Sequence, residues 1–266
     1  MNGMLKVAIQ GIGIVGPGLE NWSQAAPLLR GEQPYEAAPL PALKPELLPP
    51  NERRRTTQLI KLAIQAAGEA QQHSGIAAAD LACVFASAEG DTFIVDRLCE
   101  ALTLPEKPVS PTQFHNSVHN APAGYWAIAG AARRFSTSIT AAGASFAAGL
   151  LEAVTFVVAE GEPVLLVAYD IALPDPLAPF GDCHAPFAAA LVLSPVSKGS
   201  PLATLELTAP GPYAADASLA EEFAVLRRDN PATEALVLLE PLAQCRPGTI
   251  HLDYLNGSVL PVTLEC

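Results

Sequence analysis

The stretch that most constrains the fold runs from residue 135 to residue 168, where strand, turn and helix signals follow one another closely. Residues 136–140 (STSIT) are rich in β-branched side chains, which predicts a strand. The small residues 141–145 (AAGAS) predict a tight turn, and the apolar run ending at Gly161 predicts a buried helix. With a further strand at residues 164–168, the stretch predicts a β-α-β unit.

The sharp turn inside this unit is where many enzymes carry a nucleophile, because backbone N–H groups there point toward the reacting centre. Here the turn holds no cysteine. The absent thiol is therefore the main functional clue in the chain.

Composition favours one α/β protein and excludes several classes of function. Half of the 266 residues are hydrophobic and 16% are charged, so a large core is expected. The net charge of −12 opposes binding to nucleic acid, and residues 53–55 and 133–134 are among the few basic clusters. No uninterrupted apolar run is long enough to span a bilayer, and the first residues lack a signal-peptide pattern. A cytoplasmic protein without a membrane span is expected.

No cofactor or metal is expected. The five cysteines (Cys83, Cys99, Cys183, Cys245 and Cys266) are scattered without a C-x-x-C pattern, which predicts free thiols. His115 and His119 could share a helix face, but flanking prolines and the lack of a third ligand favour a loop or interface role. The glycines of residues 11–16 imitate a dinucleotide fingerprint without its helix or later acidic residue, so they predict a strand ending in a glycine turn.

Alternating strand and helix patterns along the rest of the chain predict a layered α/β fold. Helices are expected at residues 56–74, 91–102, 121–132 and 219–228, and loops at 34–50, 105–120 and 174–186. Strands are expected at residues 5–9, 81–86, 235–239 and 250–255, with 187–193 and 202–207 forming a hairpin-like pair.

Several segments, in order, resemble the β-ketoacyl synthase family of the thiolase superfamily. They are residues 11–18 (GIGIVGPG), 53–76 (beginning RRRTTQLIK), 109–111 (VSP), 120–124 (NAPAG), 141–153 (AAGASFAAGLLEA) and 186–195 (PFAAALVLSP). The resemblance covers roughly residues 5–205 and implies a thiolase-like αβαβα fold with a truncated C-terminal half. The chain is then one domain, residues 1–266, in which 206–266 are a reduced remnant of the second half.

The sequence departs from this family at its catalytic positions. Aligning from Ser110 and Pro111 places Gly143 at the family's cysteine, whereas aligning back from Gly161 places Ala142 there. Neither residue can form an acyl thioester. The family's two catalytic histidines also have no counterpart after Pro210, since His251 lies in an alternating strand pattern. The resemblance therefore implies that no catalytic residue is present.

The nearest resemblance is to the short chain-length factors associated with aryl polyene biosynthesis, which are non-catalytic partners of an active ketosynthase. It implies a heterodimer with that ketosynthase, with an acyl carrier protein contacted only indirectly. In the family, the strand before the turn pairs across the two-fold axis and the preceding loop reaches the partner's acyl tunnel. The implied interface and tunnel residues are Phe114, His115, Asn116, Ser117, Val118, Phe135, Ser136, Thr137, Ser138, Ile139 and Thr140.

Two other functions remain open at this point. Ser145 stands near a G-x-S-x-G pattern, and Asp170 and His184 follow in the order of a hydrolase triad. Against this serine acyltransferase or hydrolase, the last small residue is Ala147 and no HGGG-type loop is present. The other alternative is a homodimeric protein that binds acyl groups without a ketosynthase partner.

Overall fold

A computed structural model describes residues 5–196, 201–212 and 221–266 as one mixed sheet with helices on both faces. The described strands are in the order β3-β2-β4-β5-β1-β6-β9-β7, and β8 pairs with β9. Their bounds are β1 Leu5–Val15, β2 Ala82–Ala86, β3 Ser136–Ile139, β4 Val164–Asp170, β5 Phe187–Ser194, β6 Ala203–Leu207, β7 Gly211–Pro212, β8 Gly248–Asp253 and β9 Ser258–Glu265.

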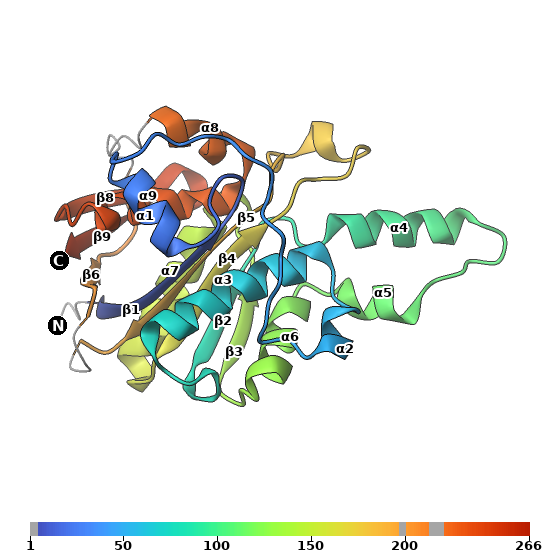
Figure 1. Cartoon of the computed structure of the whole chain (residues 1–266), viewed down its shortest axis with the longest axis horizontal. Helices are drawn as coiled ribbons and strands as arrows, with labels where there is room; N and C mark the ends of the chain where they lie inside the picture. Colours follow the sequence, from blue (N-terminus) through green and yellow to red (C-terminus); the bar gives the residue numbers. More distant parts are fainter. Residues whose placement is uncertain (1–4, 197–200, 213–220) are drawn as a thin grey trace.

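The helices cover the two faces of this sheet and also project from it. α3 and α6 pack on one face and α7 on the other, while α4 and α5 extend away from the body of the protein (Figure 1). The bounds of the α-helices are α1 Trp22–Leu29, α2 Pro50–Arg53, α3 Gln58–Ser74, α4 Thr92–Thr103, α5 Pro111–Asn116, α6 Ala121–Gly130, α7 Ser145–Glu160, α8 Glu221–Asp229 and α9 Ala235–Ala243.

Central strands bury side chains on both faces, as strands between two helical layers must. Along β4, Leu166 faces the core that contains α7 and α9, whereas Leu165 and Val167 face the core that contains α3 and α6. β5 alternates in the same way, and all of its eight residues are buried. Two separate hydrophobic cores therefore hold the sheet from opposite sides.

The glycines of β1 allow α3 to lie directly on the sheet. A Cβ atom on Gly11 would overlap the carbonyl oxygen of Ala70, and one on Gly13 would overlap that of Ala66. Only hydrogen fits at these two positions, because the helix backbone itself is the obstacle. The glycine pattern that imitates a nucleotide fingerprint thus serves helix–strand packing.

Two side chains of α3 complete the hydrogen bonding of β1 beyond its pairing with β6, which ends at Ile9. The Ile12 N–H donates to His73 Nδ1 at 3.2 Å, and the Ile14 N–H donates to a Glu69 carboxylate oxygen at 2.9 Å. Glu69 also accepts from the Trp22 N–H at the start of α1. Burial raises the pKa of this carboxyl, although both backbone donors oppose the shift.

The predicted β-α-β unit is confirmed, with β3, the turn at 141–145, α7 and β4 in the expected order. β2 pairs in parallel with both β3 and β4. The helix predicted at 56–74 is also confirmed: Thr57 caps it, its hydroxyl accepting from the Ile60 N–H, and Gly75 ends it in a left-handed conformation. The helix predicted at 219–228 starts outside the described residues and is described from Glu221.

Several local predictions were wrong. The strand predicted at 235–239 is the helix α9, because a short apolar run does not distinguish the two states. Residues 187–193 and 202–207 do not pair, since β1 lies between β5 and β6 and bonds to both. The expected loop at 105–120 contains the helix α5, capped by Ser110. β1 continues through its glycines to Val15 instead of turning after Ile9.

The close contact between β1 and α3 gives a stability prediction. We expect Gly13→Ala to lower the free energy of unfolding by about 1–3 kcal/mol, because the added methyl forces the helix from the strand. Gly68→Ala in α3 meets open space and should raise it by about 0.5–1 kcal/mol. Urea denaturation of both variants measures this, and equal stability of the two would contradict the packing described.

Candidate functional site

The turn between β3 and α7 is a strained elbow with small exposed residues at its tip. Ala142 has a φ of 48°, in the left-handed region that disfavours residues other than glycine. Ala142 and Gly143 are both exposed, and they begin the 3₁₀ turn η2 (Ala142–Ala144). An elbow of this shape presents its tip to an incoming group, but here that tip carries a methyl group or a hydrogen.

Loops from three neighbouring strands meet around this elbow, at the carboxyl ends of β2, β3 and β4. The Asp170 carboxylate accepts from the Ser87 hydroxyl at 2.7 Å and from the N–H groups of Ala88 and Glu89. The Thr140 hydroxyl donates to the Ala88 carbonyl at 3.1 Å. Burial raises the pKa of Asp170 to about 6, against the opposing effect of its donors. Asp170 therefore fixes the loop that lies beside the elbow.

Ser145, Asp170 and His184 do not form a triad within the described part of the chain. The buried Ser145 hydroxyl donates to the Ala142 carbonyl at 2.7 Å and accepts from the Ala141 N–H at 3.0 Å, so it closes the elbow. The Asp170 carboxylate is hydrogen-bonded to the loop at residues 87–89. Among the described residues, no hydrogen bond joins Asp170 or Ser145 to His184. The Ser145 hydroxyl has a structural role.

The second feature near the elbow is the outer edge of the sheet, formed by β3. Within the described chain β3 pairs with β2 only. A groove of about 560 Å³ runs between this strand and α6. Its lining residues are short or polar: His119, Asn120, Ala123, Gly124, Ala127, Ser136, Thr137 and Ser138.

The backbone groups on the open side of β3 can be assigned from the bonds on its other side. The carbonyl groups of Phe135 and Ile139 accept from β2 and the loop after it, so they point inward. Because backbone polar groups alternate along a strand, those of Ser136 and Ser138 point outward. At the start of this edge, the half-exposed ring of Phe135 stacks on Phe156 with ring centroids 4.7 Å apart.

The third feature is the projecting pair of helices α4 and α5, which carries exposed apolar side chains. Phe114 is 64% exposed and Val118 is 50% exposed, although both are large and apolar. In contrast, Asn116 is buried, donates to the Arg55 carbonyl at 2.8 Å and accepts from the Tyr125 hydroxyl at 3.0 Å. Asn116 thus attaches α5 to the body, and Phe114 and Val118 face outward.

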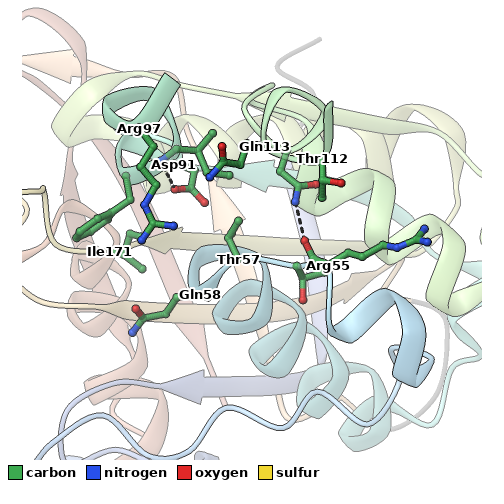
Figure 2. A pocket seen from close by; sticks show the side chains of 12 residues that line it. Arg55, Thr57, Gln58, Asp91, Arg97, Thr112, Gln113 and Ile171 are labelled. Atoms are coloured by element: carbon green, nitrogen blue, oxygen red, sulfur yellow. Dashed lines mark hydrogen bonds between the residues drawn. The ribbon is translucent and has the colours of Figure 1, made fainter. Parts of the chain in front are cut away.

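A pocket of about 390 Å³ lies where α3, α4 and α5 meet (Figure 2). Arg97 and Asp91 line it together with residues of the three helices and of the segments just before α3 and just after β4 (Thr57, Gln58, Ile171 and others). Asp91 Oδ1 accepts from the Ile94 N–H, while its buried Oδ2 has no partner among the described residues. The mixture of charges and amides suits a small polar group better than an acyl chain.

Histidines and cysteines are dispersed over the described residues. His115 lies edge-on to Tyr125, whereas His119 Nε2 lies 3.3 Å from the Ser87 carbonyl, so the two rings contact different parts of the chain. No group of three or more histidine, cysteine, aspartate or glutamate side chains gathers for a metal ion in the ranges the structure describes. All five cysteines are free thiols.

One described segment, residues 142–160, is long and apolar enough to cross a membrane. It consists of η2 and α7, and more than half of it is buried inside the protein. Because α7 packs against β2 and β4, its apolar character belongs to the core.

The mixed sheet, its helical layers and the β3–α7 elbow define a thiolase-like fold of the ketosynthase type. Residues 21–243 match the family described as "Beta-ketoacyl synthase, N-terminal domain". The chain belongs to this family. No curated protein sequence matches the chain.

Solved structures share this fold at low sequence identity. A ketosynthase (ApeO) in complex with its chain length factor (ApeC) from Xenorhabdus doucetiae gives a TM-score of 0.73 at 20% identity, covering 97% of this chain and 99% of that chain. The ishigamide ketosynthase/chain length factor gives a TM-score of 0.71 at 15% identity, covering 98% of this chain and 99% of that chain. Ketosynthase twelve of the bacillaene polyketide synthase from Bacillus amyloliquefaciens gives a TM-score of 0.60 at 15% identity, covering 80% of this chain and 46% of that chain.

The elbow and β3 follow from the sequence, but the groove beside them does not. Its walls come from α6, where Ala123, Gly124 and Ala127 bring no bulk. The sequence predicts a helix at residues 121–132, but it does not indicate which neighbour this helix approaches. Arg97 and Asp91 were also missed, because separate helices bring the lining of their pocket together only in the folded chain.

The structural role of Ser145 gives a prediction. Ser145→Ala leaves the Ala141 N–H without its acceptor, so we expect a loss of about 1–2 kcal/mol in the free energy of unfolding. Ser258→Ala, at an exposed hydroxyl that donates to the Leu255 carbonyl, is the control and should cost less. A fluorophosphonate probe should leave Ser145 unlabelled, and labelling there would restore the hydrolase hypothesis.

Proposed function

We propose that this chain is a non-catalytic subunit that pairs with an active β-ketoacyl synthase and shapes its acyl tunnel. The observation that carries the proposal is an exposed elbow whose tip, Ala142 and Gly143, offers neither a thiol nor a hydroxyl. No side chain at the tip can accept an acyl group, so the reaction would take place in the partner. We treat residues 206–266 as the reduced second half of a single domain.

The open edge of β3 supports pairing with another chain. The outward N–H and C=O groups of Ser136 and Ser138 lack a strand neighbour among the described residues, and such edges readily add a strand. We assign residues 135–140 to this interface, with the partner's strand running antiparallel about a pseudo-two-fold axis. The groove between β3 and α6 would receive the partner's side chains.

The projecting helices support the second part of the proposal. Phe114 on α5 and Val118 just after it expose apolar surface, and burying that surface in a partner would be favourable. We propose that Phe114 closes the far end of the partner's tunnel, flanked by His115, Ser117 and Val118. Asn116 would position this group through its bonds to Arg55 and Tyr125.

The finer assignments follow the sequence resemblance. We propose that the product is an aryl polyene, that the complex works in the cytoplasm, and that an acyl carrier protein delivers substrate to the ketosynthase subunit. The solved complexes of similar fold include a type II polyketide acyl-carrier protein with its ketosynthase, which supports a carrier-dependent reaction.

Association is tested by co-purification with the candidate ketosynthase. Ser138→Pro removes an outward N–H without removing a bond to β2, so we expect a folded chain that loses the partner. Ser138→Ala keeps the N–H and should still co-purify. Gly124→Arg should block the groove, whereas Gly68→Arg, also facing open space, should not. Failure of the wild-type chain to associate would overturn the proposal.

The role of Phe114 is tested on the products of the complex. We expect Phe114→Ala to lengthen them, because a shorter side chain leaves room for further extension units. Phe180→Ala is a matched control, since Phe180 is 84% exposed but lies on the separate turn η3 (Ala178–Phe180). Products measured by mass spectrometry that keep their length in Phe114→Ala would remove Phe114 from this role.

A further inference from the structure

The pocket between α3, α4 and α5 is lined by opposite charges that do not pair with each other. Asp91 caps the start of α4, Arg97 lies on the second turn of that helix, and both line the pocket (Figure 2). In the part of the chain that the structure describes, neither side chain forms an ion pair. A cavity with an unpaired carboxylate and an unpaired guanidinium can bind a molecule that itself carries both signs of charge.

The acidic side of the pocket has an unmet hydrogen bond. Asp91 is 8% exposed, and its Oδ1 accepts from the Ile94 N–H at 3.2 Å, whereas its buried Oδ2 has no partner among the described residues. Buried carboxylate oxygens normally accept a hydrogen bond, because their desolvation is otherwise uncompensated. Arg97 and Gln113 lie on either side of Asp91 in Figure 2, and their long side chains can rotate to admit a donor such as an ammonium group.

The basic side of the pocket suits a carboxylate. Figure 2 shows the Arg97 side chain extending from α4 toward the beginning of α3, which also lines the pocket. The Thr57 hydroxyl accepts from the Ile60 N–H, and α3 itself offers no acceptor to the N–H groups of Gln58 and Leu59 before it. These N–H groups carry the partial positive charge of the helix end, which adds to the attraction of the guanidinium for an anion.

A third part of the lining is apolar. Phe93, Ile94 and Ile171 contribute to the pocket, and Phe93 is 39% exposed although it is large and apolar. An apolar group that covers these side chains would gain free energy from burial. The volume of about 390 Å³ lies within the range of small-molecule sites. The pocket thus combines an acidic, a basic and an apolar region.

We propose that this pocket binds a free α-amino acid with an apolar side chain. The ammonium group donates to Asp91 Oδ2, and the carboxylate accepts from Arg97 and from the N–H groups of Gln58 and Leu59. The side chain of the ligand packs against Phe93. The site is lined by this chain alone, so the inference does not rest on the proposed pairing with a ketosynthase.

The ligand class is tested on the purified full chain by ligand-detected NMR, which covers millimolar affinities. The probes are L-leucine, 4-methylpentanoic acid, which lacks the ammonium group, and L-leucinamide, which lacks the carboxylate. We expect leucine to bind and each analogue to bind at least about tenfold more weakly, because one charged hydrogen bond is lost. Analogues that bind as well as leucine, or no binding of leucine at millimolar concentration, would overturn the proposal.

Two variants separate recognition of the ligand from a structural role. Asp91→Asn keeps a capping oxygen for α4 but replaces Oδ2 by an NH₂ group, so leucine should bind about tenfold more weakly while 4-methylpentanoic acid is unaffected. Arg97→Gln should weaken leucine but not leucinamide. Arg134→Gln, outside the pocket and paired with Glu162 at 3.0 Å, is the control and should bind as the wild-type chain does.

The paired analogues keep the result interpretable if a variant is less stable. A variant that has lost only its fold would weaken leucine and the matching analogue by the same factor. Equal weakening of leucine and 4-methylpentanoic acid by Asp91→Asn would therefore reduce Asp91 to the cap of α4 and overturn the assignment of the ammonium site. Wild-type affinity for leucine in both Asp91→Asn and Arg97→Gln would place the ligand elsewhere on the chain.

Discussion

The structure depends on the direct contact between the backbone of α3 and the glycines of β1. This contact places the helix on the sheet at a distance that any β-carbon at Gly11 or Gly13 would prevent. It also brings Glu69 and His73 to the backbone N–H groups that β1 leaves unpaired after β6 ends. The parallel strands β2, β3 and β4 all end on the same side of the sheet, where the elbow lies.

The elements that could be predicted from the sequence are those whose signals are local. β3, the elbow and α7 follow from one continuous stretch, and α3 carries its own cap and terminating glycine. The partners of β5 and β6 could not be predicted, because β1, distant in sequence, inserts between them. The apolar residues 235–239 fit helix and strand equally, and only packing against α1 and η4 (Pro231–Glu234) decides for α9.

In the candidate site, too, only the features with local sequence signals could be predicted. The absence of a thiol in the turn and the strand before it follow from residues 136–145, whereas the edge position of that strand and the roles of neighbouring polar groups required coordinates. Ser145 and Asp170 occur in the order of a hydrolase, yet each is bonded to nearby loop backbone and supports the elbow. In the same way, Asn116 lies among the residues expected to face a partner but anchors α5 to its own chain.

The small side chains along the β3 groove bear on the choice of partner. Ala123, Gly124 and Ala127 face Ser136 and Ser138 across this groove, so neither wall supplies bulk. A second copy of the same chain would bring equally small residues to an interface at β3 and leave voids, which weaken packing. A strand bearing larger side chains would fill the space, so under the proposed pairing the groove fits a dissimilar subunit better than a second copy.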